Sequence, residues 1–308
     1  MANAQRREIV VISGKGGTGK TSITCALAPF AKNTVFCDLD VDVPDMHIIL
    51  APQAQKTEAF MGGHKAIIRQ EECVGCGTCQ KLCRFEAIRQ IDGHFAVDSA
   101  LCEGCGVCSA LCPQKAIDFP EALCGHWSIS ETRFGPFVHA QLKPGEENSG
   151  KLVSLLKQEA RALAKKLGFT SLLCDGSPGI GCPVVSSLAG ATLAVAVVEP
   201  SLSGLHDFKR VAGVSAHFHI PCGVIINRYD LNRQGTEEFE AYCQKEGYPL
   251  FGKIPFSAEL QAASQKGLAL TETGGALTET VAAIWEKIVN FHPSTRSQLR
   301  PMTAKRNE

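Results

Sequence analysis

The sequence predicts an α/β protein with a mostly parallel, doubly wound sheet that is interrupted by a smaller, inserted α+β domain. Apolar segments of strand length alternate with segments of helical periodicity, which is typical of parallel sheets. A glycine-rich loop at residues 14–21 follows the first strand and precedes a helix, as phosphate-binding loops do. Between residues 58 and 144 the alternation stops and cysteine and glycine become frequent, which indicates a separate domain.

The first strand, residues 8–13, is a short apolar run of the kind that is buried in parallel sheets. The glycine-rich loop leads into a helix over residues 19–31, and residues 151–167 form another helix with a leucine-rich apolar face. The remaining predicted strands are 34–39, 171–174, 193–198, 223–227 and 250–254, and the remaining predicted helices are 205–216, 236–246 and 277–291.

The chain of 308 residues is long enough for two domains. We predict a discontinuous P-loop nucleotide-binding domain formed by residues 1–57 and 145–291. We predict an inserted domain with its flanking linkers at residues 58–144, and a loose, polar tail at residues 292–308.

The composition indicates in which compartment the protein is found and which classes of partner are disfavoured. Acidic and basic residues balance at 31 each, so no overall field favours nucleic acid. The beginning of the chain lacks the apolar core of a signal peptide, and no segment approaches the length of a transmembrane helix. The cysteines are spaced like metal ligands and not like a disulfide framework. We therefore expect a cytoplasmic protein with no nucleic-acid partner and no stable membrane anchor.

Eight of the 15 cysteines form two runs with the same spacing, C-x2-C-x2-C-x3-C. The runs are Cys73, Cys76, Cys79, Cys83 and Cys102, Cys105, Cys108, Cys112. This is the ligand pattern of a two-cluster bacterial ferredoxin, in which the fourth cysteine of each run binds the other cluster. We predict two 4Fe-4S clusters, the first held by Cys73, Cys76, Cys79 and Cys112, and the second by Cys83, Cys102, Cys105 and Cys108.

A pair of zinc sites is the alternative for these cysteines, and it is disfavoured because zinc sites usually use cysteine pairs instead of tandem runs of four. The residues after the runs also repeat, since Ala87-Ile88 matches Ala116-Ile117 at the same offset. One difference is Arg84, which stands where Pro113 follows the other run. Its positive charge is expected to raise the reduction potential of the second cluster.

Residues 14–21 fit the phosphate-loop motif G-x-x-x-x-G-K-S/T in full. Glycines let backbone N–H groups converge on phosphate oxygens, and the start of the helix adds partial positive charge. Lys20 is expected to reach the β- and γ-phosphates of ATP, and Thr21 to hold Mg²⁺. The predicted nucleotide contacts are Gly14, Lys15, Gly16, Gly17, Thr18, Gly19, Lys20 and Thr21.

Lys15, followed by two glycines, makes this loop resemble the K-G-G-x-G-K-S/T loop of the MinD/ParA/nitrogenase-iron-protein class of ATPases. With the cysteine runs and the segment 145–151, the chain as a whole is similar to MinD/ParA/Mrp-type ATPases that contain an inserted two-cluster ferredoxin domain. The resemblance implies an ATP-dependent homodimer, or a heterodimer with a paralogue, in which Lys15 reaches the ATP of the partner subunit.

The resemblance also implies roles for residues at three strand ends. Asp40 matches the residue that orients the attacking water, so that Lys15, Lys20 and Asp40 are the predicted catalytic residues. Asp38 and Asp175 match residues on the Mg²⁺ side of the site. Asp175 opens a segment that resembles the D-x-P-P-G switch of this class, with serine in place of the first proline. Asn227 matches the residue that contacts adenine.

Cys182 follows Asp175 by seven positions, as a cluster-ligating cysteine follows the switch aspartate in the nitrogenase iron protein. The resemblance implies that Cys182 from two subunits holds an additional metal or cluster. A cysteine that packs at a helix start, or is merely reactive, is the alternative. A complete bridging cluster needs a second cysteine from each subunit, and Cys124 is the candidate.

These features predict an ATPase whose nucleotide-driven dimer switching is coupled to electron transfer through two 4Fe-4S clusters, with ATP and Mg²⁺ as the other cofactors. The expected partner is a redox protein or an iron–sulfur protein. Two alternatives have the same residues. One is an ATP-dependent carrier or maturation factor for iron–sulfur clusters or metal, and the other is a regulatory or positioning ATPase that senses redox state.

Overall fold

The computed structural model describes residues 7–143 and 149–293. The described chain divides into two compact units, and each is presented by itself. Unit 1 contains residues 7–57, 127–141 and 149–293, and unit 2 contains residues 58–126 and 142–143. The predicted start of the returning domain at residue 145 and most of the predicted tail lie outside the described residues.

A nine-stranded sheet forms the centre of unit 1 in the described part of the chain, in the order β13-β12-β11-β1-β10-β2-β9-β8-β3. Its strands are β1 (Arg7–Ser13), β2 (Thr34–Asp38), β3 (Gln53–His64), β8 (Glu121–Thr132), β9 (Gly135–Leu142), β10 (Ser171–Pro178), β11 (Leu193–Val198), β12 (Cys222–Asn227) and β13 (Leu250–Ile254). Every pair from β13 to β9 is parallel, which confirms the predicted mostly parallel sheet.

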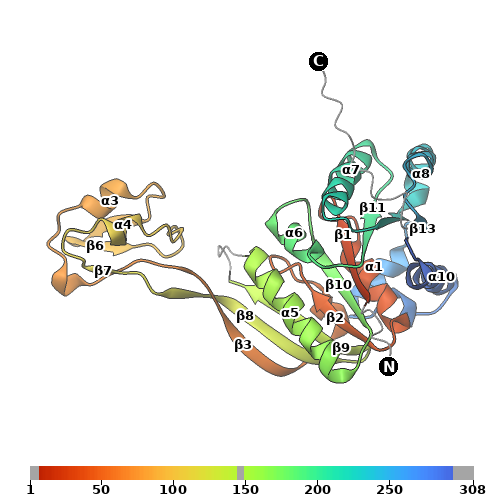
Figure 1. The fold of residues 1–308 in the computed structure, drawn as a ribbon, viewed down its shortest axis with the longest axis horizontal. Helices are drawn as coiled ribbons and strands as arrows, with labels where there is room; N and C mark the ends of the chain where they lie inside the picture. The colour runs from red at the N-terminus through yellow and green to blue at the C-terminus, as the bar shows by residue number, and fades with distance from the viewer. Residues whose placement is uncertain (1–6, 144–148, 294–308) are drawn as a thin grey trace, which may run out of the picture. The chain divides into compact units, whose positions relative to one another are not determined.

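Helices cover both faces of this sheet (Figure 1). They are α1 (Lys20–Leu27), α2 (Met46–Leu50), α5 (Ser149–Leu167), α6 (Cys182–Leu188), α7 (Leu202–His217), α8 (Arg233–Glu246), α9 (Ala258–Gln265) and α10 (Ala276–Asn290). On one face, α1 and α10 bury their apolar side chains against Ile9 and Val11 of β1. Successive residues of a strand point to opposite faces, so the buried side chains of Val10 and Ile12 lie on the other face of the sheet. On that face α5, α6 and α7 contact the strands.

Two predicted elements have different ends in the structure. The helix predicted over residues 19–31 ends at Leu27, and a short 3₁₀ turn covers Ala28–Phe30, since Pro29 cannot donate the next backbone hydrogen bond. The strand predicted at 171–174 continues to Pro178, so the predicted switch segment is the buried end of a strand. The longer strand β10 includes Asp175, whose side chain is fully buried.

The predicted boundary of the inserted domain needs a correction, because residues 127–141 belong to unit 1 and not to the insert. Phe137 and Val138 of β9 pair in parallel with Phe36 and Cys37 of β2, and all four side chains are buried. The outer strand β3 alternates poorly and is largely exposed, so its sequence lacks the apolar signal of a sheet strand. Both β3 and β8 run from one unit into the other.

Unit 2 contains two short helices and two two-stranded antiparallel sheets. They are α3 (Thr78–Leu82), α4 (Val107–Ala110), β4 (Ile67–Ile68), β5 (Ile88–Ile91), β6 (His94–Val97) and β7 (Ile117–Asp118). Its small core includes Ile68, Ile88, Phe95 and Ile117, and six of the run cysteines line or complete this core. The sequence repeat is also a repeat of backbone conformation. Gly77 and Gly106 each adopt the left-handed conformation, and each directly precedes an α-helix.

No helix among the described residues is long and apolar enough to cross a membrane.

His139 on β9 is a partly buried ionisable residue of unit 1. Its ring stacks on Phe137 with the ring centroids 4.5 Å apart, and Nε2 lies 2.9 Å from Ser130 Oγ. Burial, with a smaller contribution from His47, lowers the pKa of His139 from 6.5 to about 4. The neutral ring is therefore the form that the folded state favours.

We expect the stability that His139 contributes to be complete above pH 6.5 and to be lost as the pH falls from 6.5 towards 4. The unfolded chain binds a proton in this range that the folded chain excludes. The full contribution is up to about 3 kcal/mol. Urea unfolding at pH 7.5 and pH 5 measures it, with His139→Gln as the comparison. The variant should lose less stability between the two pH values than the native chain, and equal losses would contradict the expectation.

Candidate functional site

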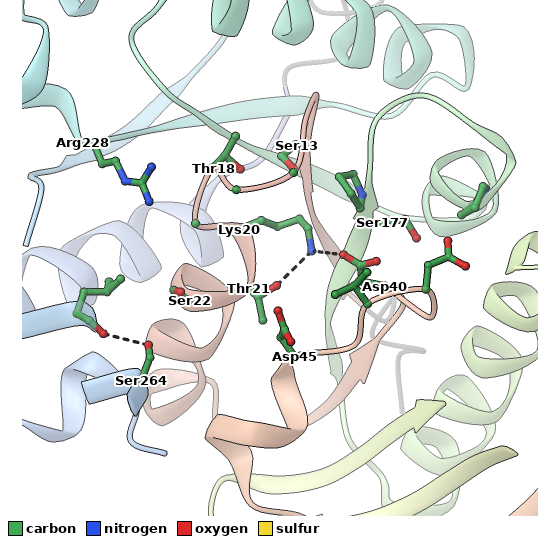
Figure 2. A pocket seen from close by; sticks show the side chains of 18 of the residues that line it. Ser13, Thr18, Lys20, Thr21, Ser22, Asp40, Asp45, Ser177, Arg228 and Ser264 are labelled. Carbon is green, nitrogen blue, oxygen red and sulfur yellow. Dashed lines mark hydrogen bonds and ion pairs between the residues drawn. The ribbon is translucent and has the colours of Figure 1, made fainter. Parts of the chain in front are cut away.

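The glycine-rich loop joins the end of β1 to the start of α1 and lies on a cavity of about 750 Å³ in unit 1, a common size for a ligand pocket. Gly17 and Gly19 have φ values of 80° and 84°, which residues with a side chain rarely adopt. Figure 2 shows the cavity and the side chains around it. The loop residues that line it are Gly16, Gly17, Thr18, Gly19, Lys20 and Thr21.

Thr18 provides a test of whether this cavity fits a phosphate group. Its side chain is 3% exposed, and its hydroxyl oxygen has no hydrogen-bond partner among the described residues. Buried polar atoms in proteins normally have a partner. A phosphate oxygen in the cavity would supply one, so the loop fits a phosphate group.

Lys20 lies at the centre of a buried acidic cluster. Its Nζ donates to Asp175 Oδ2 at 2.8 Å. It also lies 3.6 Å from Asp40 Oδ2, which Figure 2 shows beside it. Asp175 is fully buried and also accepts hydrogen bonds from Thr21 Oγ1 at 2.6 Å and Thr24 Oγ1 at 2.9 Å. Burial alone would lower the pKa of Lys20, but the charges of Asp175 and Asp40 outweigh it and raise the pKa. The site therefore holds Lys20 as an ammonium.

Asp38 and Asp40 have different environments at the end of β2. Asp38 is fully buried, with Oδ1 accepting from Asp40 N at 3.0 Å and Oδ2 from Met46 N at 3.2 Å. Asp40 lines the cavity, and burial raises its pKa to about 6 against the opposing effect of Lys20. Asp40 thus faces the ligand space, while Asp38 stands behind it and fixes the backbone of the acidic segment.

Lys15 does not point into the cavity of its own chain. Its Nζ lies 3.4 Å from Glu199 Oε2, and the other oxygen of Glu199 accepts a hydrogen bond from Arg228. The side chain of Lys15 is 38% exposed. The two carboxylate oxygens of Glu199 therefore contact two cations, Lys15 of the loop and Arg228, which lines the cavity. Lys15 can leave this contact without uncovering a buried charge.

Asn227 is placed differently from the prediction that it contacts adenine. It is buried, its Nδ2 donates to Thr18 O at 2.8 Å, and its Oδ1 accepts from Arg228 N at 3.0 Å. Among the described residues Arg228, and not Asn227, lines the cavity. The amide is already used to hold the loop backbone, so Asn227 is a positioning residue in this structure.

Sequence reasoning also missed residues that complete the cavity. Leu260, Ser264 and Gln265 come from α9, and Arg228 follows β12. The α9 segment lies about 240 residues from the loop and carries no recognised motif, so nothing in its sequence indicated a site. Arg228 could have been found, because it stands beside Asn227 at the carboxyl end of a parallel strand, where ligands bind in such sheets.

Unit 2 contains two small cavities, and each is lined by four of the run cysteines. Cys73, Cys76, Cys79 and Cys112 line the first. Cys83, Cys102, Cys105 and Cys108 line the second. In both cases three cysteines come from one run and the fourth comes from the other run, so the two runs are interleaved in space.

The arrangement of the donors distinguishes kinds of metal group. Among the residues that the structure describes, no group of three or more His, Cys, Asp or Glu side chains converges in a way that could hold a single metal ion. A zinc ion needs its thiolates about 2.3 Å from one point. Four cysteines line each cavity, and thiolates are the usual ligands of iron–sulfur clusters, so the donor set fits such a cluster.

Cys182 is exposed at the first position of α6, directly after the switch segment. Its neighbour across the fold is Gly150 of α5, whose added Cβ would lie 3.4 Å from Cys182 Cβ. Cys124, the other candidate donor, is buried in unit 2 with its thiol bonded to Gly62 O. Cys124 is therefore already engaged within its own unit.

The family model for the CobQ/CobB/MinD/ParA nucleotide binding domain matches residues 9–270. The chain belongs to this family. A relative with 31% identity is an uncharacterized protein of Methanocaldococcus jannaschii, and the match covers 92% of this chain and 97% of that protein. The septum site-determining protein MinD of Neisseria meningitidis is 24% identical over 84% of this chain and 82% of its own length.

Solved structures of the CobQ/CobB/MinD/ParA family have the same fold. MinD of Pyrococcus horikoshii, complexed with Mg-ADP, has a TM-score of 0.57 at 15% identity, covering 92% of this chain and 96% of that one. MinD in the MinC:MinD complex of Aquifex aeolicus has a TM-score of 0.54 at 17% identity, covering 94% and 99%. Membership of this ATPase family confirms the predicted enzyme class, an ATPase, and the P-loop fold.

Proposed function

We propose that this chain is an ATPase whose nucleotide cycle is coupled to electron transfer through two 4Fe-4S clusters held by unit 2. The observation that carries the proposal is the interleaving of the cysteine runs, since each of the two cavities is lined by three cysteines of one run and one of the other. This pattern accompanies a complete phosphate loop in the same chain. When bound, such clusters accept and donate single electrons.

In hydrolysis, Lys20 stabilises the charge on the transferred phosphoryl group, and Thr21 and Asp175 are the residues that would hold Mg²⁺, which would neutralise charge on the phosphates. Thr21 Oγ1 already lies 2.6 Å from Asp175 Oδ2, so the two oxygen atoms that would face the metal ion are adjacent. Lys20 Nζ, now on Asp175, exchanges that contact for phosphate oxygens. Asp40 lines the cavity and orients the attacking water, and Asp38 acts through the backbone N–H of Asp40 that it holds.

Lys15 completes the site across a dimer, formed either by two copies of this chain or by this chain and a paralogue. Its ammonium is held by Glu199 in one chain, at a partly exposed position, and is free to move to a phosphate of the partner subunit. Such an exchange links ATP binding to dimer closure. The cysteine thiols of unit 2 orient the clusters, and a redox or iron–sulfur protein is the partner that supplies or receives the electrons.

A second candidate function is the delivery of iron–sulfur clusters or metal. The exposure of Cys182 at the start of α6 favours it, because this residue follows the switch segment and is accessible to a partner. In this function the side chains of Cys182 from the two subunits of a dimer receive the cargo. A third candidate is a positioning ATPase that senses redox state. It is kept because one relative is named as a septum site-determining protein.

An anaerobic redox titration followed by electron paramagnetic resonance (EPR) tests the coupling. The purified protein is titrated with and without Mg-ATP or a non-hydrolysable analogue. Coupling predicts a shift of at least about 60 mV in one midpoint potential, which is about tenfold in the equilibrium of a one-electron couple. Superimposable curves would contradict coupled electron transfer. Loss of additional iron in Cys182→Ala, with both ferredoxin-type signals intact, would instead support delivery.

A further inference from the structure

The internal repeat of unit 2 allows its two cysteine sites to be compared position by position. Gly77 and Gly106 occupy equivalent places, with φ values of 70° and 74°. A Cβ added at Gly77 would lie 3.5 Å from the ring of Phe95, and one added at Gly106 would lie 3.3 Å from the ring of Phe119. At these positions the two sites have the same backbone and the same kind of neighbour.

The equivalence fails two residues earlier, at Gly75 and Gly104. Both have left-handed backbone, with φ values of 70° and 63°. A Cβ added at Gly75 would meet nothing within 4 Å, whereas one at Gly104 would lie 2.4 Å from His64 O. The end of β3 therefore packs directly on the loop that carries Cys102 and Cys105, and the first site has no such contact at its equivalent glycine.

Lys65, the residue after β3, is bound to the same loop. Its Nζ donates to Cys102 O at 2.9 Å and to Ser99 O at 3.0 Å. Its backbone N–H donates to Pro120 O at 3.2 Å, and the ring of His64 stacks on Phe119 with the centroids 5.0 Å apart. These contacts fix a positive charge on the backbone of a cysteine that lines the second cavity.

Other charges surround the two cavities. Glu103 lines the second cavity as an exposed carboxylate, and Arg84 follows Cys83. Lys81, near Cys76 of the first cavity, is an exposed ammonium. Solvent screens exposed charges, whereas the ammonium of Lys65 is half-buried and held by two carbonyls. Lys65 is thus the cation with the most constrained position among those named.

We propose that Lys65 is a positioning residue that makes the two cysteine sites unequal, by fixing the Cys102 loop and by favouring the reduced form of the cluster at the second site. The inference rests on the proposed function, since it concerns the clusters of unit 2. Reduction adds negative charge to a cluster, and a fixed cation nearby stabilises the added charge. A cluster bound by Cys83, Cys102, Cys105 and Cys108 would therefore be the one that is reduced more readily.

The test compares Lys65→Met with Lys65→Arg and with Lys81→Met in the full-length, cluster-loaded protein. Iron and acid-labile sulfide are measured first, and the two midpoint potentials are then determined by anaerobic EPR titration. Lys65→Met should lower one midpoint so that its reduced-to-oxidised ratio at fixed potential falls about tenfold, equal to about 59 mV. Lys65→Arg keeps the charge and should restore the native value. Lys81→Met should shift the other midpoint, and by less.

A matched pair of glycine variants tests the packing part of the inference. Gly75→Ala and Gly104→Ala introduce the same side chain at similar left-handed backbone, but only the second meets His64 O. Gly104→Ala should change the same midpoint as Lys65→Met, or lose up to half of the iron and sulfide, while Gly75→Ala should do neither. Equal effects of the two glycine variants would overturn this part.

The outcomes separate this inference from the proposed function. A native protein that holds no iron or sulfide after anaerobic reconstitution would defeat the proposed function itself. A loaded protein in which Lys65→Met leaves both midpoints unchanged, or shifts both equally, would overturn only the role of Lys65. Loss of half of the iron in Lys65→Met, with full loading in Lys65→Arg, would support it.

Discussion

Replacing Lys20 with methionine should lower the ATPase rate by at least about 10²–10³-fold, the usual effect of removing one preorganised charge from a phosphoryl-transfer site. Lys20 is 5% exposed, and its ammonium donates a hydrogen bond to Asp175 Oδ2 at 2.8 Å. The variant keeps a side chain of similar length, so the loop can retain its fold. Steady-state phosphate release measures the effect, and a rate within tenfold of the native one would contradict the assigned role.

The same substitution should also destabilise unit 1 at neutral pH, because it leaves Asp175, Asp38 and Asp40 close together without their cation. Removing one partner from a buried ion pair costs about 3–5 kcal/mol. The loss should shrink as the pH falls, since protonation removes the repelling charges. Urea unfolding at pH 7.5 and pH 5.5 measures this effect. Lys32→Met, an exposed lysine in the same unit, is the control and should change neither rate nor stability.

Loss of Cys112 should remove the first cluster and leave the second, so that about half of the iron and acid-labile sulfide remains. Cys112 belongs to the second run, yet it lines the cavity of Cys73, Cys76 and Cys79. Cys79→Ala should therefore give the same result as Cys112→Ala. Iron and sulfide analysis after anaerobic reconstitution is the measurement.

Double variants make the test of interleaving decisive. Cys79→Ala with Cys112→Ala affects one predicted site and should still leave about half of the iron, whereas Cys79→Ala with Cys83→Ala affects both and should leave almost none. The reverse result would mean that each run keeps its own fourth cysteine. Cys243→Ala, a buried cysteine outside the runs, is the control and should retain the full iron content.

The phosphate loop and the cysteine runs are the two motifs whose residues the structure brings together. The phosphate loop appears between strand and helix as expected, because its glycines leave the backbone few alternatives at that place. The two cysteine sets also gather as their spacing predicts, since a short repeated unit brings its own three cysteines together. In both cases the local sequence determines which side chains meet.

Features that depend on distant segments were missed. The outer strand β3 is mostly exposed, and its polar sequence gave no period that would mark it as part of the sheet. The hydrogen bond from the amide of Asn227 to Thr18 O, 209 positions away, depends on how β12 lies beside the loop. The contact between Lys65 and Cys102 likewise joins segments that share no motif.

The chain leaves unit 1 and returns to it at two neighbouring points of the sheet. Unit 1 is left after Thr57 and re-entered at Trp127, and at this point Thr57 Oγ1 lies 2.9 Å from Ser128 Oγ. Lys56 Nζ also lies 4.8 Å from the centre of the Trp127 ring. Insertion between neighbouring points adds little to the entropy of closing the loop. The length of the segment between Thr57 and Trp127 can therefore change with little effect on the stability of the sheet in unit 1.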